Sequence, residues 1–320
     1  MKSLDCTTRA GLPGPHLDER PHPVRTGTRA GTTESRQGSS VCPGLPGRRP
    51  GDRARLWQLV AAIGIWLPTL PLLLAKSTAG SLEHREWTVQ GVTREALIHA
   101  PSPDPTDPAP LVFAFHGHGG SARQAARSFR LHECWPEAIV VYPQGLPTPG
   151  RLADPQGRMA GWQSAVGQLG DRDLAFFDTM LEGLATEHVV NRNRVHATGH
   201  SNGGWFTYLL WEARSDQLAA VAPSAAALPG ARSLKPKPVL HVAGRNDGLV
   251  RFAWQERTIN ALRRLGQCDA GRPWEEEPGC TLYPSPIGGP VVTFIHAGGH
   301  RYPSEAPAII VRFFQQHALP

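Results

Sequence analysis

Short apolar runs rich in β-branched residues alternate with amphipathic stretches from residue 87 to the end of the chain. Several of these runs are continuously apolar, which is typical of central strands in a parallel sheet that is covered on both faces. The predicted strands are Trp87–Val92, Ala96–His99, Leu111–Phe115, Ile139–Tyr142, Val195–Thr198, Ala219–Ala222, Val239–Val242 and Val291–Ile295.

The stretches between the runs have the period of a helix with one apolar face. In one of them Leu174, Phe177, Leu181 and Leu184 recur at steps of three and four, which gathers them into one stripe. The predicted helices are Ser121–His132, Asp173–His188, Gly203–Arg214, Phe252–Leu265 and Glu305–Gln316. This order predicts a three-layer α/β fold, with a mostly parallel central sheet and helices on both faces.

The start of the chain lacks this pattern. Residues 1–54 contain seven prolines and eight glycines without apolar periodicity, so we expect a disordered Pro/Gly/Arg-rich leader. Residues 55–79 hold a run of 20 uncharged residues, preceded by arginines and followed by small residues, which predicts an export signal or, if it stays uncleaved, a membrane anchor. Pro68 and Pro71 favour cleavage. We therefore expect a folded domain at 80–320 in a secreted, extracellular or periplasmic protein, with membrane contact only through an uncleaved leader.

Composition and charge exclude other classes. A chain of 320 residues with 40% hydrophobic side chains can bury a sizeable core. The net charge of +6 belongs to residues 1–79, because the first 55 residues hold ten basic and five acidic side chains, Lys76 adds one positive charge, and residues 80–320 hold 22 of each sign. The equal numbers of basic and acidic side chains in residues 80–320 predict no nucleic-acid partner.

The cysteines give no metal motif. Neither a CxxC pair nor an HExxH segment occurs, so we expect no metal site. Cys268 and Cys280 enclose a Pro/Glu/Gly-rich loop and are candidates for a disulfide in an oxidising space. Cys134 is expected to be a small buried side chain.

The clearest chemical motif is a G-x-S-x-G sequence from Gly199 to Gly203, between the predicted strand Val195–Thr198 and a predicted helix. A tight turn from strand to helix strains the backbone at the central serine and crowds its neighbours, so both flanks need glycine. Ser201 is thus predicted to be a nucleophile. A free hydroxyl is a weak nucleophile and needs a base, which in turn needs an acid to orient it.

The acid and the base are expected later in the chain, in the order Ser, Asp, His. Asp247 follows the strand Val239–Val242 at the edge of the sheet that holds Ser201, although a simple turn aspartate is the alternative. His300 follows the last predicted strand through a glycine pair that lets the imidazole turn back toward the serine. His296 competes for this role but lies very close to the strand end.

The oxyanion of an acyl-transfer intermediate requires two backbone N–H groups. Asn202, directly after the nucleophile, is predicted to supply one, and His118 in the glycine-rich loop after Leu111–Phe115 the other. That loop has neither the G-K-[ST] nor the G-x-G-x-x-G spacing of a nucleotide site, so we expect no nucleotide to bind there.

With these residues in place, the chain resembles the secreted polyhydroxybutyrate depolymerase and feruloyl esterase-like (LpqC-type) family of α/β-hydrolases. The resemblance runs from about Trp87 to Phe314 and rests on LVFAFHGHGG, IVVYPQG, GWQ, DRDLAFFDTML, RVHATGHSNGG, PVLHVAGRNDGLV and AGGH. It implies the α/β-hydrolase fold, the triad Ser201, Asp247 and His300, and cofactor-free cleavage of carboxylic esters through an acyl-enzyme.

The substrate is less constrained by the sequence. Trp162 and Trp205, together with Trp211, are candidates for an aromatic platform that binds a small or oligomeric ester, from a plant polysaccharide or a polyester; for Trp205 and Trp211 a place in the helix core is the alternative. Two other functions stay open, a serine peptidase of the prolyl oligopeptidase type and a non-catalytic secreted binding protein on a hydrolase scaffold.

Overall fold

The computed structural model describes residues 81–102, 106–150, 152–228, 234–274 and 277–320. The predicted leader (1–54) and the predicted export or anchor segment (55–79) lie outside these residues. Among the helices of the described part of the chain, none combines the length and the apolar character needed to cross a membrane.

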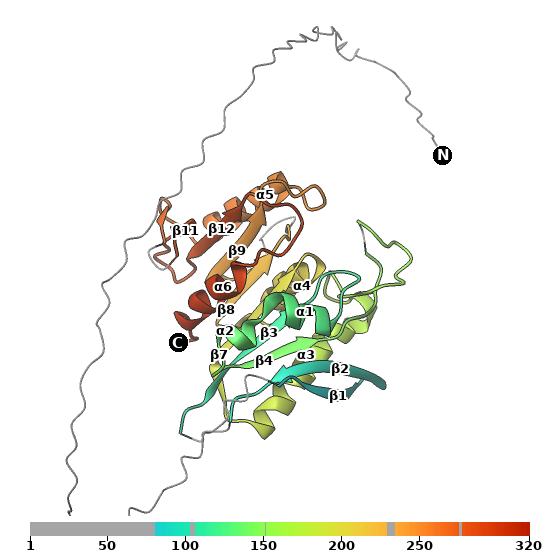
Figure 1. Cartoon of the computed structure of the whole chain (residues 1–320). Helices are drawn as coiled ribbons and strands as arrows, with labels where there is room; N and C mark the ends of the chain where they lie inside the picture. Colours follow the sequence, from blue (N-terminus) through green and yellow to red (C-terminus); the bar gives the residue numbers. More distant parts are fainter. Residues whose placement is uncertain (1–80, 103–105, 151, 229–233, 275–276) are drawn as a thin grey trace, which may run out of the picture. The chain divides into compact units, whose positions relative to one another are not determined.

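A ten-stranded sheet forms the centre of the described part (Figure 1), in the order β1-β2-β4-β3-β7-β8-β9-β12-β11-β10. The six strands from β4 to β12 in this order run parallel, and antiparallel strands complete both edges. The strands are β1 (Glu83–Val89), β2 (Val92–His99), β3 (Ala109–Phe115), β4 (Ile139–Pro143), β7 (Val190–His200), β8 (Ala220–Ser224), β9 (Val239–Gly244), β10 (Arg272–Pro273), β11 (Cys280–Tyr283) and β12 (Val291–His296).

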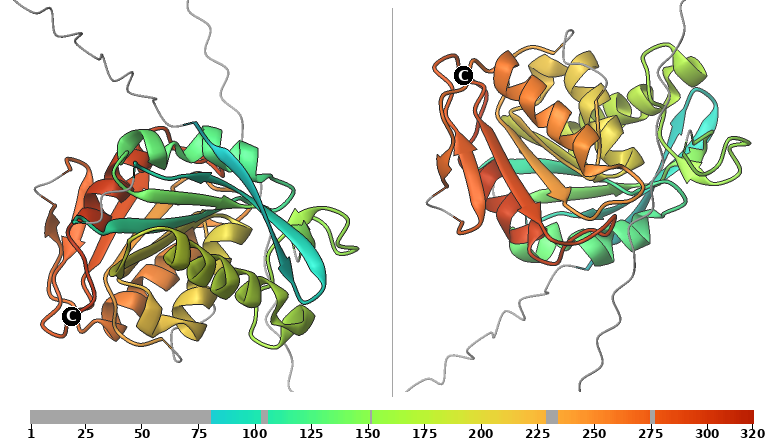
Figure 2. Two further views of the ribbon diagram at one scale, coloured as in Figure 1. Left: turned by 90° about the horizontal axis from the view of Figure 1, so that it is seen from below. Right: turned by 90° about the horizontal axis from the view of Figure 1, so that it is seen from above.

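Helices cover both faces of the sheet, as Figure 2 shows. One face carries α1 (Ala122–Phe129), α2 (Leu131–Cys134) and α6 (Ala306–Gln315), and the other carries α3 (Arg172–Glu187), α4 (Asn202–Ala213) and α5 (Phe252–Leu265). Two short 3₁₀ turns, η1 (Gln168–Asp171) and η2 (Ser215–Gln217), flank these helices. The three-layer arrangement predicted from the sequence is therefore confirmed.

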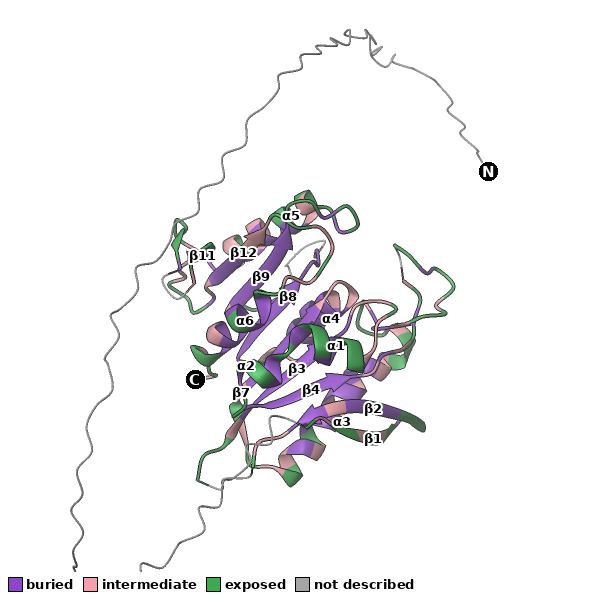
Figure 3. Cartoon of the chain, viewed as in Figure 1, coloured by how far each residue is buried: buried purple, intermediate pink, exposed green. Residues whose placement is uncertain are grey.

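The central strands are buried on both faces (Figure 3). In β3, Phe113 and Phe115 pack toward α3 and α4, whereas Val112 and Ala114 pack toward the face with α1 and α6. Side chains alternate across a strand, so a strand covered on both sides has to be apolar at every position. This explains the continuous apolar runs in the sequence.

A small hairpin stands outside the main sheet. β5 (Leu146–Pro147) pairs with β6 (Ala160–Gly161), and the segment from 146 to 162, without the undescribed Arg151, is called the arm below. Within the arm, Gly150 and Asp154 form an isolated bridge. The sequence did not predict this hairpin, because its strands have only two residues each.

The observed elements differ from the predicted ones where the backbone becomes left-handed. Gln90 and Gly91 have φ of 51° and 78°, so they form the turn between β1 and β2 that was predicted to lie within the strand Trp87–Val92. Arg130 has φ of 44°, and it divides the predicted helix Ser121–His132 into α1 and α2.

The cysteine predictions are corrected by the structure. Cys268 and Cys280 are free thiols and form no disulfide with each other. The thiol of Cys268 instead lies 3.6 Å from the carbonyl oxygen of Gly289. Cys134, predicted to be buried, is exposed: it is the last residue of the short helix α2, whose buried positions are Leu131 and His132.

Candidate active site

Ser201 lies in a sharp turn between β7 and α4, at the carboxyl end of the sheet. Its backbone has φ of 56° and ψ of −116°, outside the regions that non-glycine residues usually adopt. A Cβ on Gly203 would lie 2.2 Å from the carbonyl oxygen of Phe115, and one on Gly199 would lie 2.4 Å from the Gly203 backbone. The turn therefore requires glycine on both sides, as the motif predicts.

The structure brings the three predicted side chains together. His300 Nε2 lies 2.8 Å from Ser201 Oγ, and His300 Nδ1 lies 2.8 Å from Asp247 Oδ2. Ser201 follows β7, Asp247 follows β9 and His300 follows β12, so three parallel strands deliver the three residues to one edge of the sheet.

Asp247 is more than a turn residue. Its side chain is fully buried, and its Oδ1 accepts the backbone N–H groups of Leu249 at 2.9 Å and Val250 at 2.8 Å. These donors leave Oδ2 directed at His300 Nδ1. A carboxylate in this position favours the Nδ1–H tautomer, which leaves Nε2 free to accept the proton of Ser201 Oγ.

The competing His296 is held in its own loop. Its Nδ1 accepts the N–H of Gly298 at 3.1 Å, and its ring packs beside Phe294. A third histidine, His200, lies with its ring centre 5.1 Å from that of His300. Burial lowers the pKa of His200 to about 4, so this neighbour of His300 stays neutral at pH 7.

A buried hydrogen-bonded chain behind Asp247 was not predicted. Gln255 Nε2 donates to Asp247 Oδ2 at 3.2 Å, and Gln255 Oε1 lies 3.4 Å from His241 Nε2. Tyr208 Oη lies 2.7 Å from His241 Nδ1. Burial lowers the pKa of His241 to about 4, so the ring is neutral and can donate through Nε2 while it accepts through Nδ1. No sequence motif marks these residues, since they lie on α4, β9 and α5.

The two predicted oxyanion donors, Asn202 and His118, both line the cleft that contains Ser201. Asn202 begins α4, and its side chain binds the backbone of Trp162: Oδ1 accepts the N–H at 2.7 Å and Nδ2 donates to the carbonyl at 3.1 Å. In the glycine-rich loop, the N–H of Gly119 donates to Ala160 O at 2.7 Å. His118 precedes this anchored residue and lines the same cleft as Ser201 and Asn202.

The side chain of His118 is held by the arm. Its Nε2 lies 3.2 Å from Asp154 Oδ2, and that oxygen also accepts the N–H of Met159 at 2.8 Å. The ring is packed between two glycines, because a Cβ would lie 2.8 Å from it at Gly150 and 2.6 Å from it at Gly161. The arm thus fixes the position of His118.

Of the three predicted platform residues, only Trp205 lines the cleft. Trp162 is 1% exposed and donates its indole N–H to the carbonyl of His116 at 2.9 Å, so it packs under the loop and cannot bind substrate. Trp211 is also 1% exposed and belongs to the core. The platform role predicted for Trp162 was therefore wrong, whereas Trp211 takes the place in the helix core that was its alternative, because tertiary packing decides which face of an element is buried.

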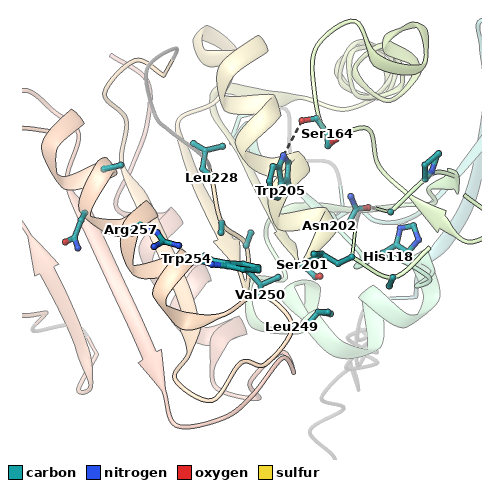
Figure 4. A pocket seen from close by; sticks show the side chains of 18 of the residues that line it. His118, Ser164, Ser201, Asn202, Trp205, Leu228, Leu249, Val250, Trp254 and Arg257 are labelled. Atoms are coloured by element: carbon teal, nitrogen blue, oxygen red, sulfur yellow. Dashed lines mark hydrogen bonds between the residues drawn. The ribbon is translucent and has the colours of Figure 1, made fainter. Parts of the chain in front are cut away.

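The main cleft beside Ser201 has a volume of about 1130 Å³ (Figure 4). Trp205 from α4 and Trp254 from α5 line it, with Leu228, Leu249 and Val250. A second cleft of about 850 Å³ shares Ser201 and His118 with the main cleft, and its lining adds His300, Arg301, Tyr302, Gln124 and Arg127. Trp254, which the sequence analysis missed, is the second aromatic wall of the main cleft.

One group of side chains in the described residues could offer metal ligands. His84, Glu86 and Glu95 are exposed on the β1–β2 hairpin, with ligand atoms within 4.8 Å of one another. Glu86 and Glu95 face each other across the two strands, and His84 Nε2 lies 2.8 Å from Glu95 Oε2. The hairpin forms the edge of the sheet, several strands from β7 and Ser201.

Comparisons with known proteins point to esterases. Over 255 residues the chain is 24% identical to the bifunctional acetylxylan esterase/xylanase of Neocallimastix patriciarum, a match that covers 69% of this chain but only 36% of that relative. Over 228 residues it is 25% identical to feruloyl esterase D of Neurospora crassa, covering 66% of this chain and 75% of that protein. No family model matches the chain.

The fold is shared with a solved esterase. The acetyl xylan esterase from Aspergillus awamori superposes with a TM-score of 0.56 at 12% identity, over 73% of this chain and 99% of that one. At this identity the likeness carries the fold alone. The protein thus has the α/β-hydrolase fold that its motifs predicted.

Proposed function

We propose that this protein is a secreted serine hydrolase that cleaves carboxylic esters through an acyl-enzyme. The observation that carries the proposal is the contact of His300 with both Ser201 and Asp247, at 2.8 Å on each ring nitrogen. The similarity to an acetylxylan esterase/xylanase and to a feruloyl esterase supports an ester as the bond that is cleaved. The uncharged run within residues 55–79 supports export.

In the proposed reaction Ser201 Oγ attacks the ester carbonyl while His300 Nε2 takes its proton. The buried Asp247 carboxylate stabilises the imidazolium that forms. The backbone N–H groups of Asn202 and His118 bind the negative oxygen of the tetrahedral intermediate. His300 then donates its proton to the alcohol oxygen as the alcohol leaves, and the same residues activate a water molecule that hydrolyses the acyl-enzyme.

The proposed substrates are acetyl or aromatic acyl esters of a plant polysaccharide, in line with the named relatives. Hydroxybutyrate oligomers, to which the resemblance in sequence points, are the second substrate to test. The main cleft supports an acyl group larger than acetyl, because the two tryptophans Trp205 and Trp254 line it.

Labelling with a fluorophosphonate tests the nucleophile. We expect the wild-type protein to be labelled at Ser201 and to hydrolyse p-nitrophenyl butyrate, and Ser201→Ala to lose both properties. Ser215→Ala, on a 3₁₀ turn outside the clefts, is the matched control. Labelling elsewhere, or turnover by Ser201→Ala, would contradict the proposal, and an unlabelled wild type would favour a binding protein. Faster cleavage of an amide than of an ester with the same acyl group would favour a peptidase.

A further inference from the structure

If the proposed function holds, the position of His300 indicates which of the two clefts receives the acyl group of the ester and which receives the alcohol. His300 must give its proton to the leaving alcohol oxygen, so the alcohol has to lie on the His300 side of Ser201. The cleft lined by His300, Arg301 and Tyr302 is on that side. The main cleft does not include His300, so it receives the acyl group.

One face of α5 forms a wall of the acyl side. Trp254, Arg257, Ala261 and Arg264 recur at steps of three and four, and all four line the main cleft. With a rise of 1.5 Å per residue, Arg257 follows Trp254 by about 4.5 Å along the helix axis, and Arg264 follows it by about 15 Å. In Figure 4, Trp254 lies between Ser201 and Arg257. An acyl group that extends from Ser201 past Trp254 therefore reaches Arg257 first.

The acyl side carries positive charge without a matching carboxylate. Among the described residues that line it, Arg257 and Arg264 are the charged ones, and no Asp or Glu is present. Neither arginine forms an ion pair within the described part of the chain. Elsewhere arginines are paired with carboxylates, for example Arg214 with Asp178 at 2.6 Å and Arg192 with Glu182 at 2.7 Å.

We propose that the acyl site takes an acyl group with a flat apolar segment and a carboxylate at its far end, so that the substrates are monoesters of dicarboxylic acids. The apolar segment packs against Trp254 and Trp205, and the carboxylate pairs with Arg257. Arg257 is exposed to solvent at the cleft, and its guanidinium can match a carboxylate with two parallel N–H···O bonds. Hydrolysis breaks the acyl–alcohol bond, forms an acyl–oxygen bond to water, and releases the alcohol and a dicarboxylate.

A pair of esters that differ in one charge tests this proposal. The para-carboxy and para-carbamoyl derivatives of methyl cinnamate have nearly the same size, and the first carries a negative charge at neutral pH. We expect the wild type to prefer the carboxylate ester by about fivefold in kcat/KM at low ionic strength, the upper range for a partly exposed ion pair. High salt should reduce this preference.

Three variants test which arginine causes the preference for the carboxylate ester. Arg257→Gln should bring the ratio of the two kcat/KM values close to one, and Arg264→Gln should lower it less, because Arg264 lies about two turns further along α5. Arg123→Gln removes an exposed arginine of α1 that lines neither cleft, so it should keep the wild-type ratio. No preference in the wild type, or an unchanged ratio in Arg257→Gln, would overturn the proposal.

A binding measurement separates this proposal from the proposed function. Ser201→Ala should bind the carboxylate ester more tightly than the carbamoyl ester, measured by quenching of tryptophan fluorescence, and Ser201→Ala with Arg257→Gln should bind both alike. Equal binding in the first of these proteins refutes the anionic acyl site even if the wild type hydrolyses both esters. Conversely, a wild type that hydrolyses neither of these esters nor p-nitrophenyl butyrate refutes the esterase proposal, while the binding result still decides the acyl site.

Discussion

The side chain of Asn202 makes two hydrogen bonds to the backbone of Trp162, one with each of its polar atoms, at 2.7 Å and 3.1 Å. This contact ties the residue after the nucleophile to the end of the arm. His118, the other proposed oxyanion donor, is tied to the same arm through Asp154. The arm therefore links the two donors, which come from loops far apart in the sequence, and its geometry should control the rate of the proposed reaction.

Gly161→Ala should disturb both donors at once. A Cβ at this position would lie 2.6 Å from His118 Nδ1 and 2.9 Å from Asn202 Oδ1, so one or both side chains must move. We expect kcat for p-nitrophenyl butyrate to fall roughly 100-fold or more, as for the loss of one oxyanion donor. Gly248→Ala, where a Cβ meets nothing within 4 Å, is the control. Wild-type kcat in Gly161→Ala would show that the arm does not position the donors.

Asp154→Asn tests the link through His118. The hydrogen bond from the Met159 N–H lowers the pKa of Asp154, so the carboxylate is ionised at pH 7 and attracts His118. The neutral amide weakens this contact, so we expect about a tenfold lower kcat with little change in KM, because a donor to the oxyanion acts mainly in the transition state. The control is Asp216→Asn, which removes an exposed carboxylate paired with Lys235. An increase in KM alone would instead indicate a role in ground-state binding.

Gln255→Met tests the chain behind the triad. Methionine has a similar size but cannot donate to Asp247 Oδ2, which lies 3.2 Å from Gln255 Nε2. We expect kcat to fall about tenfold for every ester, with the order of substrate preference unchanged, because the change acts through Asp247 and His300. Trp254→Ala, in the wall of the acyl cleft, should instead change the preference between butyrate and acetate esters. A change of preference in Gln255→Met would contradict a positioning role.

Acid should destabilise the folded protein well above pH 4. Burial lowers the pKa of His116, His200, His241 and His317 to about 4. In the unfolded chain a histidine has a pKa near 6.5, so between pH 6.5 and 4 the unfolded state binds more protons and stability falls as pH falls. Each such histidine contributes up to about 1.4 kcal/mol per pH unit.

Urea unfolding at pH 7, 6 and 5 measures this dependence. We expect the free energy of unfolding to decrease steadily over this range. His317→Gln removes one of the four groups, so its free energy of unfolding should change less steeply with pH than that of the wild type. An equal slope in the two proteins would show that His317 is not held neutral in the folded state.

The sequence predicted much of this molecule because the signals were local. A strand buried on both faces has to be apolar throughout, so β3, β4 and β9 were visible as short apolar runs. The turn at Ser201 leaves no space for side chains on its flanks, so glycines marked it. Asp247 and His300 followed from the order in which parallel strands deliver residues to one edge of a sheet.

Prediction from the sequence failed for residues whose roles depend on contacts between segments that are distant along the chain. Nothing in the local sequence distinguishes Trp162 from Trp254, but packing buries Trp162 under the glycine-rich loop and leaves Trp254 in the wall of the cleft. Likewise, Gln255 acquires its contact with Asp247 because α5 packs beside the carboxyl end of β9. The chain by itself thus determined the fold class and the residues that meet at Ser201. Only the tertiary structure decided which side chains line the clefts and hold the arm, because those roles arise from distances that local sequence does not encode.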